Sequence, residues 1–490
     1  MQSDMQETKL VPSLLIGSEF SPGEGTETFE VRAPYGGELL ATLRESTRDE
    51  VDAAIALAHE TFRTQALTPY ERSRILRRSA ELLAERAEEF SWSIVAEAGK
   101  PIRDARAEVA RAVLAFELCA EEAKRIGGDY IPIESTPGSE NRRAFTIRRP
   151  AGVVCAITPF NGPVNQLSHK VPTAIAAGCT VVLKPAEVTP LSGIMLVQMM
   201  LDAGLPAGFV TVVQGRGETV GQQLLEDPRF AAYSFTGSTA VGTHIRRTVG
   251  LRKTLLELGN NSANIVHSDA NLQLAATKLA KSLSVYSGQV CISAQRILVH
   301  RAVFDEFAGL LTEHVSALVV GDPSDEATDV GPMISLEAAE RAESWILEAQ
   351  AEGATILTGG VRTGQTVTPA IVARPSMQGN LACNEAFAPV AALIPYDTLA
   401  EAIEIANSTE YGLQAGIFTQ STDVAMAAAD RLEVGGVIVN DASSYRVDSM
   451  PYGGIKHSGT GREGIRYAIE EMTEPRLVAF NLQLPEGEGL

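Results

Sequence analysis

Residues 152–159 have the sequence GVVCAITP, a short run of β-branched and small apolar residues that stops at a Thr-Pro pair. Three runs of the same kind follow it: TVVLKP at 180–185, FVTVVQG at 209–215 and AAYSFTG at 231–237. A segment of helical character follows each run. Strands that alternate with helices of about 10–15 residues predict parallel pairing with right-handed crossovers. We therefore expect a doubly wound, Rossmann-like α/β sheet, whose ligands bind at the carboxyl ends of the strands.

A second series of apolar runs starts after residue 258 and predicts a second α/β domain. Its expected strands lie at 262–267, 296–300, 390–395, 414–419 and 436–440. Ahead of both series, Thr68-Pro69-Tyr70-Glu71 combines a Thr cap, a Pro at the first helical position and a Glu three residues after the cap. This combination predicts the start of a helix. We expect its apolar face to continue through Leu83, Phe90 and Ile94.

Two extended, β-prone segments lie at the margins of these series: AFTIRRP at 144–150 and RLVAFNLQL at 476–484. In a monomer such strands would have open edges, because nothing pairs with their outer N–H and C=O groups. Pairing across a subunit interface would cover those edges. Pairing of the two edges within one chain would also do so, and spacing alone leaves both arrangements open.

Composition excludes several classes of function. The chain has 490 residues, which predicts two to four domains at roughly 100–200 residues each. Its 41 Lys and Arg residues against 61 Asp and Glu give a formal charge of −20, which would repel nucleic acid. Asp4 and Glu7 stand where a secretory leader would be basic and apolar. The most apolar stretch, 171–183, is shorter than the roughly 18–20 residues that span a bilayer, so we expect a cytoplasmic protein without membrane contact.

The cysteines and histidines suggest neither disulfides nor a metal site. The five cysteines are odd in number, widely scattered and contain no C-x-x-C pair. The seven histidines include no H-E-x-x-H motif and no pair at ligand spacing. We therefore expect no bound metal and at least one unpaired thiol.

Two segments at predicted strand ends could hold a nucleotide. FTGSTAVG at 235–242 ends a strand with Gly237-Ser238 before a helix, where free amides favour a phosphate; an ordinary N-cap by Ser238 is the alternative. KPAE places Lys184 and Glu187 so that the carboxylate could bind ribose hydroxyls and repel a 2′-phosphate; a solvated ion pair is the alternative. The nearby GRGETVG, which contains Gly217, has one residue too many for the dinucleotide fingerprint.

Glu257 and Cys291 are the strongest candidates for chemistry. Glu257 lies inside the apolar run LLELGNN, where burial would raise its pKa toward the range of a general base. Cys291 lies in GQVCISA, a setting that suits a reachable nucleophile better than a packed thiol. A core position is the alternative for any single cysteine.

Together, the motifs resemble the NAD(P)-dependent aldehyde dehydrogenase superfamily over nearly the whole chain. They follow the family's order: PFNGP, KPAE, FTGSTAVG, LELGN, GQVC, NEAFAPV, YGLQAGIFT and PYGGIKHSGTGREG. The resemblance implies a cofactor domain of residues 1–128 and 149–256, a catalytic domain of 257–470 and a small β oligomerisation arm of 129–148 and 471–490. A homodimer or homotetramer is then expected.

The resemblance also implies the roles of individual residues. Cys291 matches the nucleophile that forms a thiohemiacetal and then a thioester, Glu257 the general base and Asn161 the oxyanion donor. Family cofactor positions match Lys184, Glu187, Gly217, Gly237, Ser238, Glu385 and Phe387. Glu187 favours NAD, although NADP is also used in the family.

Several of the family's substrate positions are polar in this chain. The substrate positions fall on Gln166, His169, Val290, Ile292, Ser443, Tyr445 and Arg446. This lining favours a small hydroxylated or anionic aldehyde such as lactaldehyde, glyceraldehyde or a semialdehyde. Arg446 suits an anionic group, with a salt bridge as the alternative. Two further functions stay open: a coenzyme A-acylating relative, which Glu257 disfavours, and a non-catalytic structural protein on the same fold.

Overall fold

The computed structural model describes residues 10–483 of the chain. The acidic start at residues 1–9 and the last residues of the predicted arm, 484–490, lie outside this range. Within it, no helix combines the length and apolarity required to cross a lipid bilayer.

The first sheet has eight strands, and its five central strands are parallel. In spatial order they are β2 (Phe20–Ser21), β1 (Leu14–Leu15), β9 (Val210–Val212), β8 (Thr180–Lys184), β7 (Val153–Ile157), β10 (Phe230–Thr236), β11 (Lys253–Glu257) and β21 (Gly459–Thr460). The chain winds from β7 outward to β9, returns to β10 beside β7 and continues to β11. The winding therefore reverses between β7 and β10, which is where a doubly wound sheet binds its ligand.

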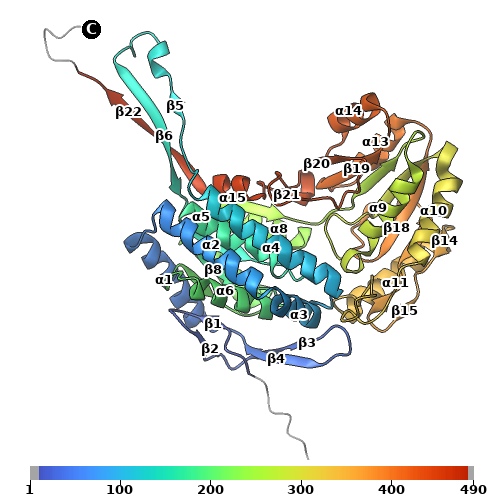
Figure 1. The fold of residues 1–490 in the computed structure, drawn as a ribbon, viewed down its shortest axis with the longest axis horizontal. Coiled ribbons are helices and arrows are strands. Elements are labelled where there is room, and N and C mark those ends of the chain that lie inside the picture. Colours follow the sequence, from blue (N-terminus) through green and yellow to red (C-terminus); the bar gives the residue numbers. More distant parts are fainter. Residues whose placement is uncertain (1–9, 484–490) are drawn as a thin grey trace, which may run out of the picture.

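The second sheet has seven strands and is also doubly wound. Its order is β14 (Thr355–Thr358), β17 (Ala370–Ala373), β18 (Val390–Tyr396), β13 (Arg296–His300), β12 (Ala263–Val266), β19 (Gln414–Phe418) and β20 (Gly436–Val439). The predicted strands of both series are confirmed, each within a few residues of its expected bounds. The chain is thus α/β with two doubly wound sheets, seen side by side in Figure 1.

Helices cover both sheets. In the first half of the chain they are α1 (Arg48–Thr64), α2 (Pro69–Glu85), α3 (Ala87–Ala98), α4 (Ile102–Glu122), α5 (Asn165–Ala177), α6 (Leu191–Asp202), α7 (Gln222–Glu226) and α8 (Thr239–Val249). In the second half they are α9 (Leu272–Ser284), α10 (Phe304–Ser316), α11 (Leu336–Ala351), α12 (Asn380–Cys383), α13 (Leu399–Asn407), α14 (Thr422–Arg431) and α15 (Ile465–Glu471). Two short hairpins, β3 (Thr28–Arg32) with β4 (Leu39–Arg44) and β15 (Arg362–Thr363) with β16 (Thr366–Val367), lie outside the two large sheets.

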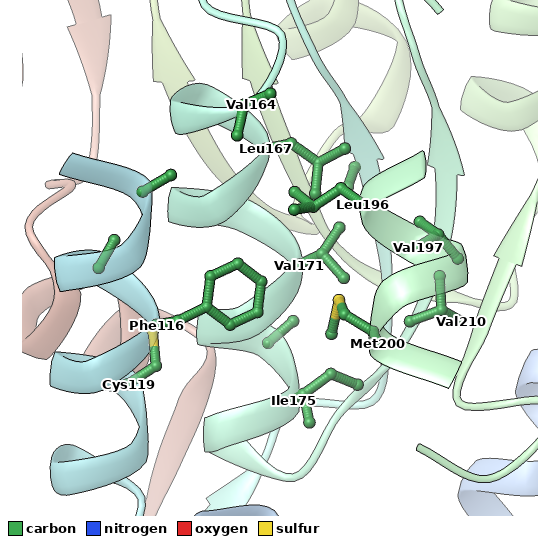
Figure 2. Packing of buried hydrophobic residues seen from close by; sticks show 14 of the residues in the cluster. Phe116, Cys119, Val164, Leu167, Val171, Ile175, Leu196, Val197, Met200 and Val210 are labelled. Carbon is green, nitrogen blue, oxygen red and sulfur yellow. The ribbon is translucent and has the colours of Figure 1, made fainter. Parts of the chain in front are cut away.

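Side chains that alternate along the strands of the first sheet pack into two hydrophobic cores, one on each face. In β7, Val154 and Ala156 pack into the core of α4, α5 and α6, whereas Val153 and Cys155 pack into a second core with α1 and α8. Successive side chains of a strand point to opposite faces, so a strand buried on both faces is a continuous apolar run. Figure 2 shows the first core, where Phe116 of α4 lies beside the apolar face of α5.

The helix expected to continue from Thr68 through Ile94 is in fact two helices, so this expectation is wrong in extent. The Thr68 capping box is present, but α2 ends at Glu85 and α3 begins at Ala87. Arg86 between them has φ −107° and ψ 19°, outside the helical region. The bend keeps Leu83, Phe90 and Ile94 in one core, which is why they mimic a single apolar face in the sequence.

The two marginal segments pair with each other inside the chain. Strand β6 (Arg142–Pro150) runs antiparallel to β22 (Thr473–Asn481), and β5 (Tyr130–Ile131) lies on the other edge of β6. This three-stranded sheet, hereafter the arm, projects away from the first sheet in Figure 1. Large apolar side chains remain exposed on it: Tyr130, Phe145, Ile147, Leu477 and Phe480.

Replacing Phe116 by alanine should destabilise the first core. The ring is fully buried beside α5, so Phe116→Ala leaves a cavity and should lower the free energy of unfolding by about 3–5 kcal/mol. Urea unfolding followed by circular dichroism measures the change. Leu114→Ala on the same helix is the control, because Leu114 is 44% exposed and its loss should stay within about 0.5 kcal/mol. Equal effects of the two variants would contradict the assignment of this core.

Candidate active site

The three residues expected to carry the chemistry come from three separate segments. Asn161 lies in the loop between β7 and α5, Glu257 is the last residue of β11, and Cys291 lies in the turn that leads to β13. Asn161 Nδ2 donates to the backbone oxygen of Gln289 at 2.8 Å, which joins the first segment to the third. Because a carboxamide has two N–H groups, one donor of Asn161 remains free of that bond.

The turn before Cys291 is held in an unusual conformation. Tyr286, Ser287 and Gly288 all have positive φ values, of 45°, 54° and 70°. A Cβ on Gly288 would lie 2.2 Å from the carbonyl oxygen of Ala388, so only glycine fits there. Tyr286 Oη donates to Ala98 O at 2.7 Å and Ser287 Oγ to Gly331 O at 2.8 Å. Strained turns of this kind persist where the surroundings fix them, often at functional sites.

A buried ion pair supports the Asn161 loop. Lys100 Nζ donates to the backbone oxygen of Asn161 at 2.7 Å and also binds the carboxylate of Glu108. The other oxygen of Glu108 accepts from the amides of Val164 and Asn165, at the start of α5. A carboxylate is favoured at a helix start, where amides lack intrahelical partners. The loop is therefore fixed from both sides.

Cys291 is partly exposed, whereas Cys119, Cys155 and Cys179, which pack in the two cores of the first sheet, are buried. Its neighbours Val290 and Ile292 form an apolar cluster with Leu413 and Tyr452. Desolvation raises the pKa of the thiol to about 12, and the nearby carboxyl groups Glu257 and Glu385 act in the same direction. The hydroxyl of Tyr452, 3.0 Å from Sγ, and the cation of Arg446 oppose this shift.

Glu257 is almost completely buried, and its Oε2 has no hydrogen-bond partner. Burial raises the pKa of its carboxyl well above the ordinary value, and the charge of Glu463 raises it further. Gly453 makes room for the group, since a Cβ there would lie 3.0 Å from Oε1. The carboxyl therefore takes up a proton readily, as a general base must.

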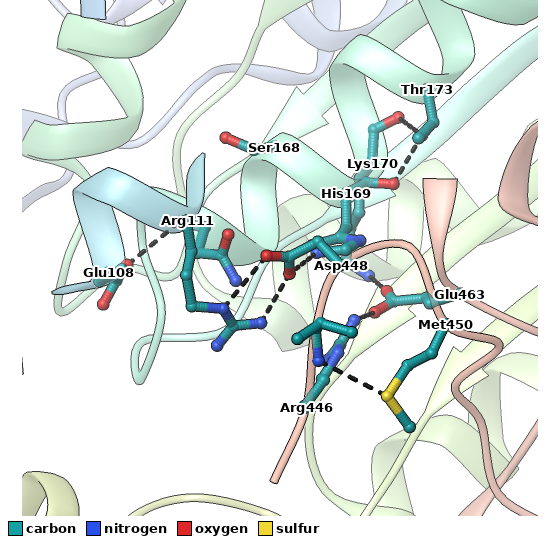
Figure 3. A network of polar contacts seen from close by, with 12 residues as sticks. Glu108, Arg111, Ser168, His169, Lys170, Thr173, Arg446, Asp448, Met450 and Glu463 are labelled. Atoms are coloured by element: carbon teal, nitrogen blue, oxygen red, sulfur yellow. Dashed lines mark hydrogen bonds and ion pairs between the residues drawn. The ribbon is translucent and has the colours of Figure 1, made fainter. Parts of the chain in front are cut away.

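The charges of Glu463, Arg446 and Lys170 act on Glu257, and Figure 3 shows the network that these three residues form. Glu463 binds two cations, Lys170 of α5 at 2.8 Å and Arg446 at 3.1 Å. These partners hold the pKa of Glu463 down at about 2, although burial alone would raise it. Beside them, Arg111 binds Asp448 through both carboxylate oxygens.

The residues expected from sequence at the substrate positions differ in burial and in hydrogen bonding. His169 is buried, with Nε2 2.8 Å from Asp448 and Nδ1 without a partner; burial lowers its pKa. Gln166 is partly buried with an unpartnered Oε1, whereas Tyr445 is exposed. The Ser443 hydroxyl donates to Ile292 O at 2.9 Å. The salt-bridge alternative for Arg446 is realised with Glu463, yet its buried Nε has no partner.

The residues matched to the cofactor lie at the strand ends of the first sheet and at the edge of the second. Lys184 at the end of β8 is buried and donates to Glu187 at 3.3 Å. Ser238 accepts from Val241 N as the N-cap of α8, after Gly237, so the N-cap alternative is present. Gly217 opens a single π-helical turn.

Glu385 and Phe387 lie on the loop before β18. Glu385 Oε1 accepts from Asn260 N at 2.8 Å, and a Cβ on Gly259 would lie 2.6 Å from Oε2. Burial raises the pKa of this carboxyl to about 7. Phe387 stacks edge-on against Phe160, next to Asn161, with ring centroids 5.9 Å apart. A partly buried carboxylate, a glycine that permits close approach to it and a helix start fit the ribose and phosphate groups of a dinucleotide.

The fold and this cradle define a dinucleotide-dependent α/β enzyme with a thiol at its site. The sequence profile of the Aldehyde dehydrogenase family matches residues 20–478, and the chain belongs to that family. It is thus an NAD(P)-dependent oxidoreductase that acts on an aldehyde.

Individual relatives cover almost the whole chain. The 3-sulfolactaldehyde dehydrogenase of Priestia aryabhattai is 49% identical over 456 residues, which cover 93% of this chain and 95% of that protein. The lactaldehyde dehydrogenase of Methanococcus vannielii is 39% identical over 93% of this chain and 97% of its own. The crystal structure of glyceraldehyde-3-phosphate dehydrogenase from Methanocaldococcus jannaschii, complexed with NADP, matches with a TM-score of 0.89 and 39% identity, over 93% of this chain and 99% of that chain.

Replacing Glu463 by glutamine tests how much its charge contributes to the free energy of unfolding. Glu463→Gln leaves Lys170 and Arg446 without a compensating charge and should lower the free energy of unfolding by about 3–5 kcal/mol at pH 7. Because the folded pKa of Glu463 lies below its ordinary value, this stabilisation is complete above about pH 4.5 and is lost as the pH falls through about 2.

Urea unfolding between pH 8 and pH 3 tests this. The gap between wild type and variant should be constant above about pH 5 and narrow below it. Glu470→Gln, which alters an exposed ion pair with Arg466, is the control and should show a small effect throughout. A gap of constant size over the whole range would show that the charge of Glu463 is not what stabilises the fold.

Proposed function

We propose that Cys291 is the nucleophile of this aldehyde dehydrogenase, Glu257 its general base and Asn161 the side-chain donor to the oxyanion. The observation that carries the proposal is the bond from Asn161 Nδ2 to Gln289 O, which brings the amide beside the segment that ends in Cys291. The charge of Glu257 acts on the pKa of the Cys291 thiol, and this proximity supports Glu257 as the base.

In the proposed reaction the Cys291 sulfur attacks the aldehyde carbon, and the π electrons of the carbonyl move to its oxygen. The free N–H of Asn161 donates to that oxygen, and loss of such a donor typically costs about 3–4 kcal/mol of transition-state stabilisation. A nicotinamide dinucleotide held by Lys184, Glu187, Ser238 and Glu385 would supply the acceptor for the hydride that leaves this carbon as the carbonyl re-forms. Glu257 then takes a proton from the water that attacks the resulting thioester, and the acid leaves Cys291.

The substrate that we propose is a small aldehyde with a hydroxyl or an anionic group, of the 3-sulfolactaldehyde or lactaldehyde type. Arg446 supports this, because its guanidinium lies on the ring of Tyr452, next to Cys291, and its buried Nε lacks a partner. The unpartnered polar atoms of Gln166 and His169 also suit a hydroxylated substrate. The names of the two curated relatives point to the same class.

For the cofactor we propose a preference for NAD over NADP. Glu187 is partly exposed beside Lys184, where a carboxylate accepts hydrogen bonds from a ribose diol and repels a 2′-phosphate. Lys184 offsets part of that negative charge, so use of NADP as well is compatible with the site. Turnover of each aldehyde with both dinucleotides measures the preference.

The arm supports an oligomer, and we propose a homodimer or homotetramer joined through it. Its exposed apolar side chains, Phe145, Leu477 and Phe480 among them, would lose contact with water in such an interface. Sedimentation velocity of the full chain distinguishes the two states. We also propose a cytoplasmic location, which is supported by the five unpaired cysteines.

Replacing the proposed nucleophile should abolish oxidation. Cys291→Ser should reduce aldehyde-dependent formation of NADH to below about 0.1% of wild type, because an alcohol is a far weaker nucleophile than a thiolate. Absorbance at the NADH band measures it with a panel of small aldehydes. Cys383→Ser, at the other partly exposed cysteine, is the control and should keep full activity. Turnover by Cys291→Ser would refute the assignment.

The same panel separates the alternative functions. A hydrolytic enzyme yields the carboxylic acid without coenzyme A, whereas an acylating one needs coenzyme A and yields its thioester. A non-catalytic protein on this fold would turn over no aldehyde.

Arg446→Gln should change substrate choice, and the ratio of two aldehydes separates this change from any effect on Cys291 that is common to both. A charge-assisted hydrogen bond to an anionic group is worth about 1.5–3 kcal/mol, so kcat/KM for 3-sulfolactaldehyde should fall about 10- to 100-fold relative to propionaldehyde. Steady-state kinetics on both aldehydes measure the ratio. Arg466→Gln, at an exposed arginine of α15, is the matched control. An unchanged ratio would assign Arg446 to the ion pair alone.

A further inference from the structure

Tyr452 lies in the PYGG motif but is not among the residues to which the family resemblance gives a role, and its position in the structure makes it a candidate catalytic residue. It is 3% exposed, and its hydroxyl lies 3.0 Å from Cys291 Sγ. Its backbone exchanges hydrogen bonds with Glu463 in both directions, so its position is tied to the buried cations of that carboxylate.

The apolar contacts of Tyr452 do not explain its hydroxyl. The ring packs with Ile292 and Leu413, and a phenylalanine would fill this cluster equally well. The oxygen adds a buried polar atom, and its hydrogen-bond partner is Cys291 Sγ. Since an unpaired buried hydroxyl is unfavourable, the oxygen is best explained by the sulfur that it faces.

Burial and Cys291 keep Tyr452 protonated, as a donor must be, although the cation of Arg446 lowers the pKa of the phenol. Arg446 Cζ lies 3.7 Å from the centroid of its ring, which places a permanent cation against the aromatic face. Burial, followed by the nearby charge of Cys291, raises the pKa of the phenol well above its ordinary value, so the hydroxyl keeps its proton at neutral pH. A protonated phenol can donate to a thiolate, and a thiolate can only accept.

We propose that the Tyr452 hydroxyl donates a hydrogen bond to the Cys291 thiolate and thereby stabilises the nucleophile before the aldehyde arrives. Tyr452 keeps its proton throughout, and the proton of the thiol goes to Glu257 or to solvent. The charged and titratable groups that act on this thiol are Tyr452, Arg446, Glu257 and Glu385, of which only the first two favour the thiolate. The inference rests on the proposed role of Cys291, but its test reads the thiol directly.

The test is alkylation of the full-length protein by iodoacetamide as a function of pH, with mass spectrometry of the Cys291 peptide. Tyr452→Phe removes one oxygen and keeps the ring. Loss of a hydrogen bond to a charged group should shift the midpoint of the Cys291 profile upward by about one to two pH units. Alkylation at pH 7 should then slow about 10- to 100-fold. The shift should be present with and without NAD.

Three controls separate this role from a structural one. Cys383, in the same samples, should keep its profile. Tyr396→Phe removes another buried hydroxyl, which donates to Val266 O at 3.3 Å, and should leave the Cys291 midpoint unchanged. Incorporation of 3,5-difluorotyrosine at position 452 makes the phenol a stronger donor and should lower the midpoint of the Cys291 profile. This measurement tests the proposal even if the Tyr452→Phe variant folds poorly.

Each outcome decides the proposal. An upward shift in Tyr452→Phe with a downward shift for the fluorinated residue supports it. A Cys291 midpoint that does not move in Tyr452→Phe overturns it, and so does a uniform loss of reactivity at every pH, which would indicate a structural role. Turnover by Cys291→Ser would refute the proposed function separately, since the alkylation profile would still report the effect of Tyr452 on the thiol.

Discussion

One carboxylate, Glu463, bound to two cations in a place nearly without water, is the interaction on which the site depends. Lys170 reaches it from α5 of the first α/β unit, and Arg446 from the loop that follows the second sheet. Removing charges from water is unfavourable unless each is paired, so this triad can exist only if the two units pack in one relative position. That position places β21 beside β11, where Glu257 is paired with Gly459 in the sheet.

The same charge sets the chemistry of its neighbour. Two buried carboxyl groups close together cannot both ionise easily. Glu463 has the cations and stays ionised, so Glu257 is left with burial and a like charge, and its pKa rises. The difference between an ionised carboxylate and a carboxyl group of raised pKa therefore follows from which of the two groups binds Lys170 and Arg446. A substitution at Lys170 or Arg446 would alter both groups at once.

Sequence patterns predict the sheets because a strand buried on both faces is recognisable by itself: β7, β8 and β10 needed no partner to be identified. They also predict Cys291 and Glu257 as candidates, since each residue stands out from its own neighbours. They do not predict the Glu463 triad, because Lys170 and Glu463 are 293 positions apart and the pairing exists only in the fold. A lysine beside a long apolar run, Lys170 before Val171, was the one available signal. Sequence patterns likewise leave open whether β6 pairs with β22 of the same chain, and the structure shows that it does.

Desolvation opposes the function of the thiol that it surrounds. Desolvation raises the pKa of the partly exposed Cys291 thiol to about 12, a value at which hardly any thiolate would exist at neutral pH. The proposed role of Cys291 therefore requires groups close to the sulfur that favour the anion. In the proposed reaction, Asn161 donates to the substrate oxygen and not to the sulfur. Within the described residues, Tyr452 is the side chain that hydrogen-bonds the sulfur, and Arg446, on its ring, is the nearby cation that favours the thiolate. The ion pair that fixes Arg446 thus also governs the sulfur, so the stability of the buried charges and the reactivity of the nucleophile have one physical origin.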